Sequence, residues 1–200
     1  MGGSIMNDSA DAKIYNLLLF YQLHRKKNLS LRKTYGMISK EHLLQQFEQR
    51  IFDESYTRIF KCLSLLDEKK LWKKVNPNVP SVGNLVLHLC GNARQWILSG
   101  LGDQTDNRQR DLEFESHKNI KKTDLIFLLE NLRVNIQQCL REVPESKYGQ
   151  THRIQGFTET GFSVLIHVIE HFSYHTGQIT TLTKLQVNID TGYYYDKKLT

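Results

Sequence analysis

Residues 167–178, HVIEHFSYHTGQ, contain three histidines spaced four apart: His167, His171 and His175. Because an α-helix turns by about 100° per residue, these side chains share one face of a predicted helix. Three other side chains adjoin this stripe: Glu170 on its flank, with Tyr174 and Gln178 beside it. The remaining positions are mostly apolar, and each unpaired buried polar group costs about 1–3 kcal/mol. We therefore expect the polar stripe to serve a function.

Histidines four residues apart on a helix can direct two ring nitrogens at one metal ion. Two protein ligands rarely hold a catalytic metal, so a third is expected from another helix. The segment 81–97, SVGNLVLHLCGNARQWI, offers His88, with Asn92 on the same face. Side chains that face inward from separate helices commonly build metal sites in bundles. We predict that His88, His171 and His175 hold one divalent ion with open positions for water or substrate. His167 is a fourth ligand, a partner of the ligands or a plain buried histidine, and we favour the last two.

The fold class follows from apolar periodicity, which predicts an all-α four-helix bundle. The predicted helices are residues 40–70, 81–99 and 123–143, with a fourth that begins at 158 or 160 and reaches about 185. The proline-containing stretch NPNVPS at 76–81 separates the first two, and Ser81 is a natural N-cap. Longer connections follow the second and third helices, at 100–121 and 144–157, with a possible extended piece at 152–155.

Charge is concentrated at the start of the chain. Residues 1–40 carry seven Lys or Arg against two acids, whereas the rest carries twenty against nineteen. The nearly neutral body argues against nucleic-acid binding, which needs a clustered excess of basic residues. We predict three parts: a basic N-terminal extension (1–39), the bundle (40–188) and a C-terminal tail (189–200).

A cytoplasmic location without a transmembrane segment is expected. The apolar stretch 14–23 is only about half the length of a membrane-spanning helix. Its basic residues follow it rather than precede it, unlike a secretory signal. It is an interfacial anchor, a helix docked on the bundle, or sequence upstream of a start at Met37. Three widely spaced cysteines, Cys62, Cys90 and Cys139, argue against a disulfide framework and fit a reducing compartment.

The segments 81–97 and 170–179, the latter with the pattern HxxxHxGQ, resemble the DinB-like metal-binding four-helix superfamily, which includes the bacillithiol and mycothiol S-transferases. The resemblance covers about residues 40–188. It implies three histidines on nickel, zinc or a similar divalent ion such as iron or manganese, a cytoplasmic protein and often a homodimer. The HLCGN and RQW details and the loop after the second helix look more like the uncharacterised branch of this superfamily than like the transferases.

Three functions remain open from the sequence. The first is a metal-dependent enzyme, most specifically a thiol S-transferase acting through a metal-activated thiolate or water on a small-molecule substrate, with hydrolysis of small amides as a variant. Glu170, Asn92 and Gln178 would then orient ligands or substrate, and Tyr174 or Arg153 would contact the substrate. The second is a non-catalytic, metal-stabilised bundle with a binding or structural role. The third is a regulatory module that acts through the basic extension.

Overall fold

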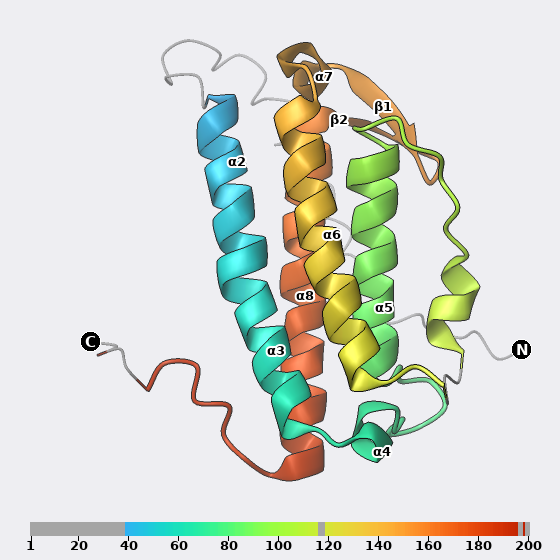
Figure 1. Ribbon diagram of the computed structural model, residues 1–200, viewed down its shortest axis with the longest axis vertical. Helices are drawn as coiled ribbons and strands as arrows, with labels where there is room; N and C mark the ends of the chain where they lie inside the picture. The colour runs from blue at the N-terminus through green and yellow to red at the C-terminus, as the bar shows by residue number, and fades with distance from the viewer. Residues whose placement is uncertain (1–38, 116–118, 196–197, 199–200) are drawn as a thin grey trace, which may run out of the picture. The chain divides into compact units, whose positions relative to one another are not determined.

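The computed structural model describes residues 39–115, 119–195 and 198. Of the predicted basic extension, only Ser39 is among the described residues. The apolar stretch 14–23 and Met37 therefore lie outside them. Four long helices form a bundle in which α5 and α6 run in the same direction, opposite to the first and last helices (Figure 1). The chain after α5 must therefore return along the outside of the bundle, and it does so next to α5. The predicted all-α fold class is confirmed.

The first long helix is built from α2 (Lys40–Glu48), a π-helical segment η2 (Gln49–Ser55) and α3 (Tyr56–Leu65). It ends five residues before the predicted end at residue 70. Leu66 is extended and buried, and the Asp67 side chain accepts a hydrogen bond from the Lys70 amide, which starts the short helix α4 (Glu68–Leu71). An N-cap within an apolar periodic stretch thus separates one predicted helix into two.

The second long helix comprises α5 (Val82–Ala93) and a π-helical continuation η3 (Arg94–Ser99). Ser81 caps it as expected, since its hydroxyl accepts a hydrogen bond from the Asn84 amide at 3.1 Å. The third is α6 (Lys122–Glu142), which gives way to extended backbone before Pro144. The fourth is α8 (Gly161–Val187), capped by Thr160 and closed by Asn188 in the left-handed conformation.

The two connections also contain regular structure. The crossing segment 100–115 includes a 3-10 turn, η4 (Arg110–Phe114), which packs on α5. Between α6 and α8 lie the short helix α7 (Glu145–Gly149) and a hairpin of β1 (Thr151–Ile154) and β2 (Phe157–Thr160). Gln155 and Gly156 both have positive φ, 53° and 83°, as the two central residues of a type I′ turn require. The predicted extended piece is therefore half of an antiparallel hairpin.

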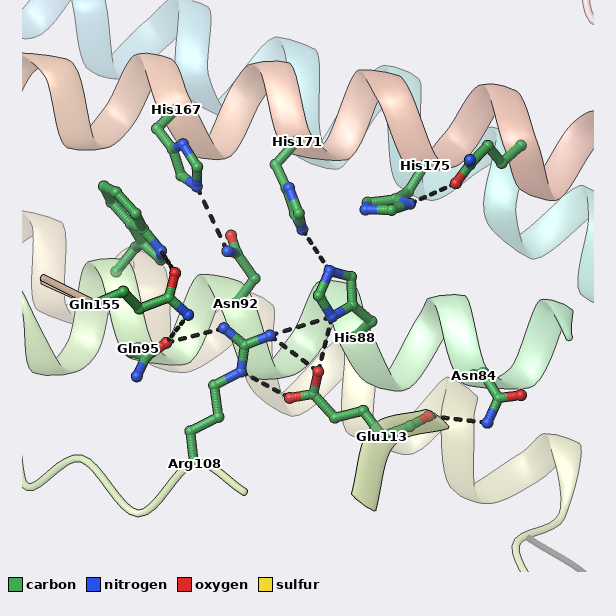
Figure 2. Close-up of polar contacts among 12 residues, drawn as sticks. Asn84, His88, Asn92, Gln95, Arg108, Glu113, Gln155, His167, His171 and His175 are labelled. Atoms are coloured by element: carbon green, nitrogen blue, oxygen red, sulfur yellow. Dashed lines mark hydrogen bonds and ion pairs between the residues drawn. The ribbon is translucent and has the colours of Figure 1, made fainter. Parts of the chain in front are cut away.

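The apolar faces of the helices meet in one core. Tyr56 of the first helix stacks on Phe172 of α8, with ring centroids 5.9 Å apart, and both side chains are almost fully buried. Residues after α8 also pack on the bundle, because the Tyr193 hydroxyl lies 2.8 Å from Thr180 Oγ1. No described helix combines the length and apolar character that a membrane crossing requires. Within this core, α8 turns its histidines toward α5 (Figure 2).

Candidate metal centre

The three predicted ligands converge in the gap between α5 and α8 (Figure 2). His88 is 6% exposed, and His171 and His175 are half-buried. The Nε2 atoms of His88 and His171 lie 3.1 Å apart. One nitrogen from each of the three rings lies within 4.8 Å of the others. This cluster can hold a single metal ion.

Glu113, on the crossing segment, fixes the ring of His88. Its Oε2 lies 2.8 Å from His88 Nδ1 and its carboxylate also accepts two hydrogen bonds from Arg108, at 2.7 and 2.9 Å. Burial alone would raise the pKa of Glu113, but the hydrogen bonds from Arg108 and His88 outweigh it and lower the pKa below its usual value. The ionised carboxylate can only accept, so His88 Nδ1 carries the proton and Nε2 is free to bind a metal.

Gln178 fixes the ring of His175, as Glu113 fixes that of His88. Its Oε1 lies 2.7 Å from His175 Nδ1, and its Nε2 donates to the Tyr174 hydroxyl at 3.2 Å. A carboxamide oxygen only accepts, so His175 Nδ1 also carries the proton. The Tyr174 ring meets the His175 ring edge-on, with centroids 4.9 Å apart. Two of the three imidazoles are therefore held in the tautomer that leaves Nε2 for an ion.

The histidines of α8 are held in the neutral form. Burial, followed by the charges of His175 and His88, lowers the pKa of His171 to about 3. Burial also lowers the pKa of His175 and of His167. A metal ligand must present a lone pair, so neutral rings at physiological pH favour metal binding.

Asn92 and His167 lie one helical turn beyond His88 and His171. Asn92 Nδ2 is 3.5 Å from His167 Nε2, and the His167 ring stacks on Trp96 with centroids 3.7 Å apart. The Trp96 indole N–H donates to Gln155 Oε1 at the tip of the hairpin, so β1 and β2 help to close this end of the site. Asn92 is 3% exposed, and its carboxamide oxygen has no hydrogen-bond partner among the described residues. An unpaired buried acceptor costs about 1–3 kcal/mol.

These residues fit a divalent transition metal. Nitrogens bound at 2.0–2.1 Å to a tetrahedral or octahedral ion lie roughly 2.8–3.4 Å apart, a range that includes the separation of His88 and His171 Nε2. Imidazole donors suit zinc and nickel, and three protein ligands leave a position open. The predicted ligand set is thus brought together, while metal occupancy and identity stay predictions.

The other predicted site residues fall into two groups. Asn92, His167, Tyr174 and Gln178 lie at the site, as just described. Glu170 is exposed on α8, and the described part of the chain contains no hydrogen bond from it to the triad. Arg153 is exposed on β1.

Sequence reasoning missed Arg108 and Glu113, because residues 100–121 have no periodicity that would place individual side chains. One signal existed in Gly91, a glycine inside an apolar helix one turn from His88. A Cβ at this position would lie only 1.9 Å from Glu113 Oε1 and 3.0 Å from Arg108 Nε. The glycine allows the crossing segment to approach α5 closely.

Gly91→Ala is therefore expected to displace the Glu113 carboxylate and weaken both folding and metal binding. We expect metal affinity to fall about 10-fold or more, as for loss of an outer partner of a ligand. Gly177→Ala is the matched control, because a Cβ there meets no atom within 4 Å. That control should stabilise α8 by up to about 1 kcal/mol. Equal metal affinities of the two variants, measured by chelator competition, would contradict the role of Gly91.

A pH effect on the metal-free protein follows from the lowered histidine pKa values. Between pH 6.5 and about 3 the unfolded chain takes up a proton at residue 171, whereas the folded chain does not. Protons therefore favour the unfolded state, and the free energy of unfolding should fall as the pH drops below 6.5. Urea titrations with chelator at pH 7.5 and 5.0 measure this difference. The difference in the free energy of unfolding between the two pH values should be smaller in His171→Gln. An unchanged difference would show that the lowered pKa of His171 is not its cause.

Two pockets adjoin the site from different sides. A largely apolar one of about 350 Å³ is bordered by Pro80, Leu85, Tyr174 and Gln178, next to His175. The other, of about 330 Å³, lies on the Arg108 and Glu113 side of α5. The first pocket is lined by Tyr174 and Gln178, which contact His175, and the second by Arg108 and Glu113, which contact His88.

Comparisons with known proteins show the fold and the family of this chain. The structure is similar to the crystal structure of a DinB-like protein from Bacillus cereus ATCC 10987, with a TM-score of 0.59, 20% sequence identity, and coverage of 77% of this chain and 97% of that chain. At this identity the likeness establishes the fold, and the predicted DinB-like helical fold is confirmed. A family model described as "Protein of unknown function (DUF1572)" matches residues 38–191, and the chain belongs to this family. A comparison with curated proteins finds no significant match.

Proposed function

We propose that this protein is a metal-dependent enzyme that uses the ion held by His88, His171 and His175 to activate a small-molecule thiol or a water. The observation that supports it most directly is that two of the three histidines have an acceptor at Nδ1. Glu113 contacts His88 and Gln178 contacts His175, and each contact favours the tautomer that leaves Nε2 for a metal. Partners of this kind orient imidazoles and make them better metal ligands. A divalent ion with an open position lowers the pKa of a bound thiol or water and so supplies a nucleophile near neutral pH.

The most specific form of this proposal is thiol S-transfer. The thiol sulfur forms a bond to an electrophilic carbon, the bond from that carbon to its leaving group breaks, and the leaving group departs with the electron pair. The thiol proton passes to solvent. The side chain of Tyr174 and the adjoining apolar pocket would contact the electrophile. Hydrolysis of a small amide by the activated water is the variant of the same chemistry.

The test is an assay of protein loaded with nickel or with zinc. Glutathione and cysteine are offered with 1-chloro-2,4-dinitrobenzene, and consumption of both reactants is followed. We expect turnover that requires the metal and is lost in His171→Ala, with His42→Ala as a control at an exposed histidine. Metal-dependent release of ammonia from small amides, without thiol consumption, would select the hydrolase variant.

The second candidate is a non-catalytic bundle in which the ion joins α5 to α8. It is favoured by the position of the ligands, since His88 and the pair His171 and His175 come from separate helices. An ion bound only to the folded state stabilises it by RT ln(1 + [L]/Kd). A full complement of tightly bound metal that raises the melting temperature, with no reaction in either assay, would select this candidate.

The assembly is also a proposal. The resemblance to DinB-like proteins, which are often homodimers, supports a homodimer. A small molecule is the proposed partner of the site, because the nearly neutral body argues against nucleic acid. Sedimentation equilibrium of the metal-loaded chain measures this state. A mass of about 23.4 kDa would contradict the dimer.

A further inference from the structure

Two polar contacts cross the gap between α5 and α8, one after the other. The first is between the Nε2 atoms of His88 and His171, and the second is between Asn92 Nδ2 and His167 Nε2. Asn92 follows His88 by four residues, and His167 precedes His171 by four, so each step is about 6 Å along its helix. Figure 2 shows the two contacts next to each other in the same gap. The carboxamide of Asn92 is thus a close polar neighbour of the triad.

The orientation of this carboxamide is fixed from the far side. Its Nδ2 contacts His167, whose ring stacks on Trp96 with a centroid separation of 3.7 Å. A neutral imidazole whose Nε2 carries no proton accepts the hydrogen bond that this amide nitrogen can donate. With the amide nitrogen committed to His167, the carboxamide oxygen is left as a buried acceptor without a partner among the described residues.

Two other polar side chains that contact the triad already have partners. The carboxylate of Glu113 binds Arg108 and His88, and the carboxamide of Gln178 binds His175 and Tyr174. On α5, Asn92 combines near-complete burial with a carboxamide oxygen that has no hydrogen-bond partner among the described residues. Because buried polar atoms in proteins are nearly always hydrogen-bonded, we expect a donor to lie next to this oxygen.

We propose that Asn92 Oδ1 accepts a hydrogen bond from a water molecule that completes the coordination of the ion held by the triad. The inference rests on the proposed metal site. An oxygen bound at about 2 Å to an ion and hydrogen-bonded over about 2.8 Å bridges roughly 5 Å, comparable to the 6 Å step from His88 to Asn92. Asn92 is then a positioning residue that favours ligands with a proton to donate over ligands without one.

Azide tests this preference, because it binds to metal ions and has no proton to donate. The proteins are loaded with cobalt(II), and azide is titrated while the visible absorption spectrum is recorded. The variants are Asn92→Leu, which keeps the volume and removes the acceptor, and Asn92→Asp, which keeps an acceptor and adds a negative charge. Asn131→Leu, at an exposed position of α6, is the control.

We expect Asn92→Leu to bind azide about 2- to 10-fold more tightly than the wild type, because the displaced water has lost one hydrogen bond. Asn92→Asp should bind azide more weakly, since its charge repels the anion, and Asn131→Leu should not differ from the wild type. Cobalt content should stay at one ion per chain in every variant.

The other outcomes separate this inference from the function on which it rests. Equal azide affinity of wild type and Asn92→Leu, with full cobalt content, would overturn the role of Asn92 and leave the metal site intact. Loss of cobalt from Asn92→Leu, with full cobalt content in Asn92→Asp, would overturn it differently, because Asn92 would then hold the ion itself. A wild-type spectrum that azide does not change would mean that no exchangeable position exists, which contradicts both the inference and the proposed enzyme.

Discussion

His88→Ala is expected to lose its divalent ion, with an affinity at least 100-fold below that of the wild type, because only two protein ligands remain and two rarely hold such an ion. The fold should survive, since Glu113 keeps its two hydrogen bonds from Arg108 when the imidazole is removed. Affinity is measured by competition with a chromogenic chelator, and folding by circular dichroism during thermal unfolding.

His171→Ala should behave in the same way, because it removes a ligand from the opposite helix. His42→Ala should bind metal like the wild type, since His42 is exposed and contacts Ser39 at the start of α2. A wild-type affinity in either His88→Ala or His171→Ala would mean that the ion lies elsewhere in the chain.

Glu113→Gln is expected to lower metal affinity by about 10- to 100-fold, although Glu113 is not itself one of the predicted ligands. The carboxamide introduced by this substitution has one acceptor oxygen and no charge, so the hydrogen bond from Arg108 Nε is lost and the tautomer of His88 is less well fixed. The side chain of Arg108 is only 5% exposed, and breaking a buried ion pair costs about 3–5 kcal/mol. The free energy of unfolding, measured with urea, should fall by an amount in that range.

The two effects can be separated with a double variant. Arg108→Met combined with Glu113→Gln removes the unpaired guanidinium, so stability should recover in part while metal affinity stays low. Glu115→Gln is the matched control, because the Glu115 side chain is exposed two residues further on. Unchanged metal affinity in Glu113→Gln would show that the carboxylate serves folding alone.

Helix periodicity predicted the bundle and the clustering of His88, His171 and His175 for a physical reason. The spacing of four between His171 and His175 fixes their shared face, and a polar face on an apolar helix needs partners inside the bundle. Asn92 could be placed by the same count from His88. These are local relations, in which backbone geometry alone determines where a side chain points.

The residues that the sequence did not reveal depend on long-range contacts. Glu113 reaches His88 across 25 positions of the chain, through a crossing segment without periodicity. Gly91 alone hinted at that close approach. Glu170, on the flank of the polar stripe, is exposed, and its role in orienting ligands or substrate stays a prediction. The end of the first helix was misplaced because Asp67 starts a new turn within an apolar pattern.

The most direct test of the central claim is an anomalous difference map from crystals of the tag-free protein loaded with nickel or zinc. The account predicts one strong peak in each chain, about 2.0–2.3 Å from the Nε2 atoms of His88, His171 and His175, with Glu113 and Gln178 still on the Nδ1 side of their rings. A peak at any other group of side chains, or no peak after loading with either metal, would contradict it.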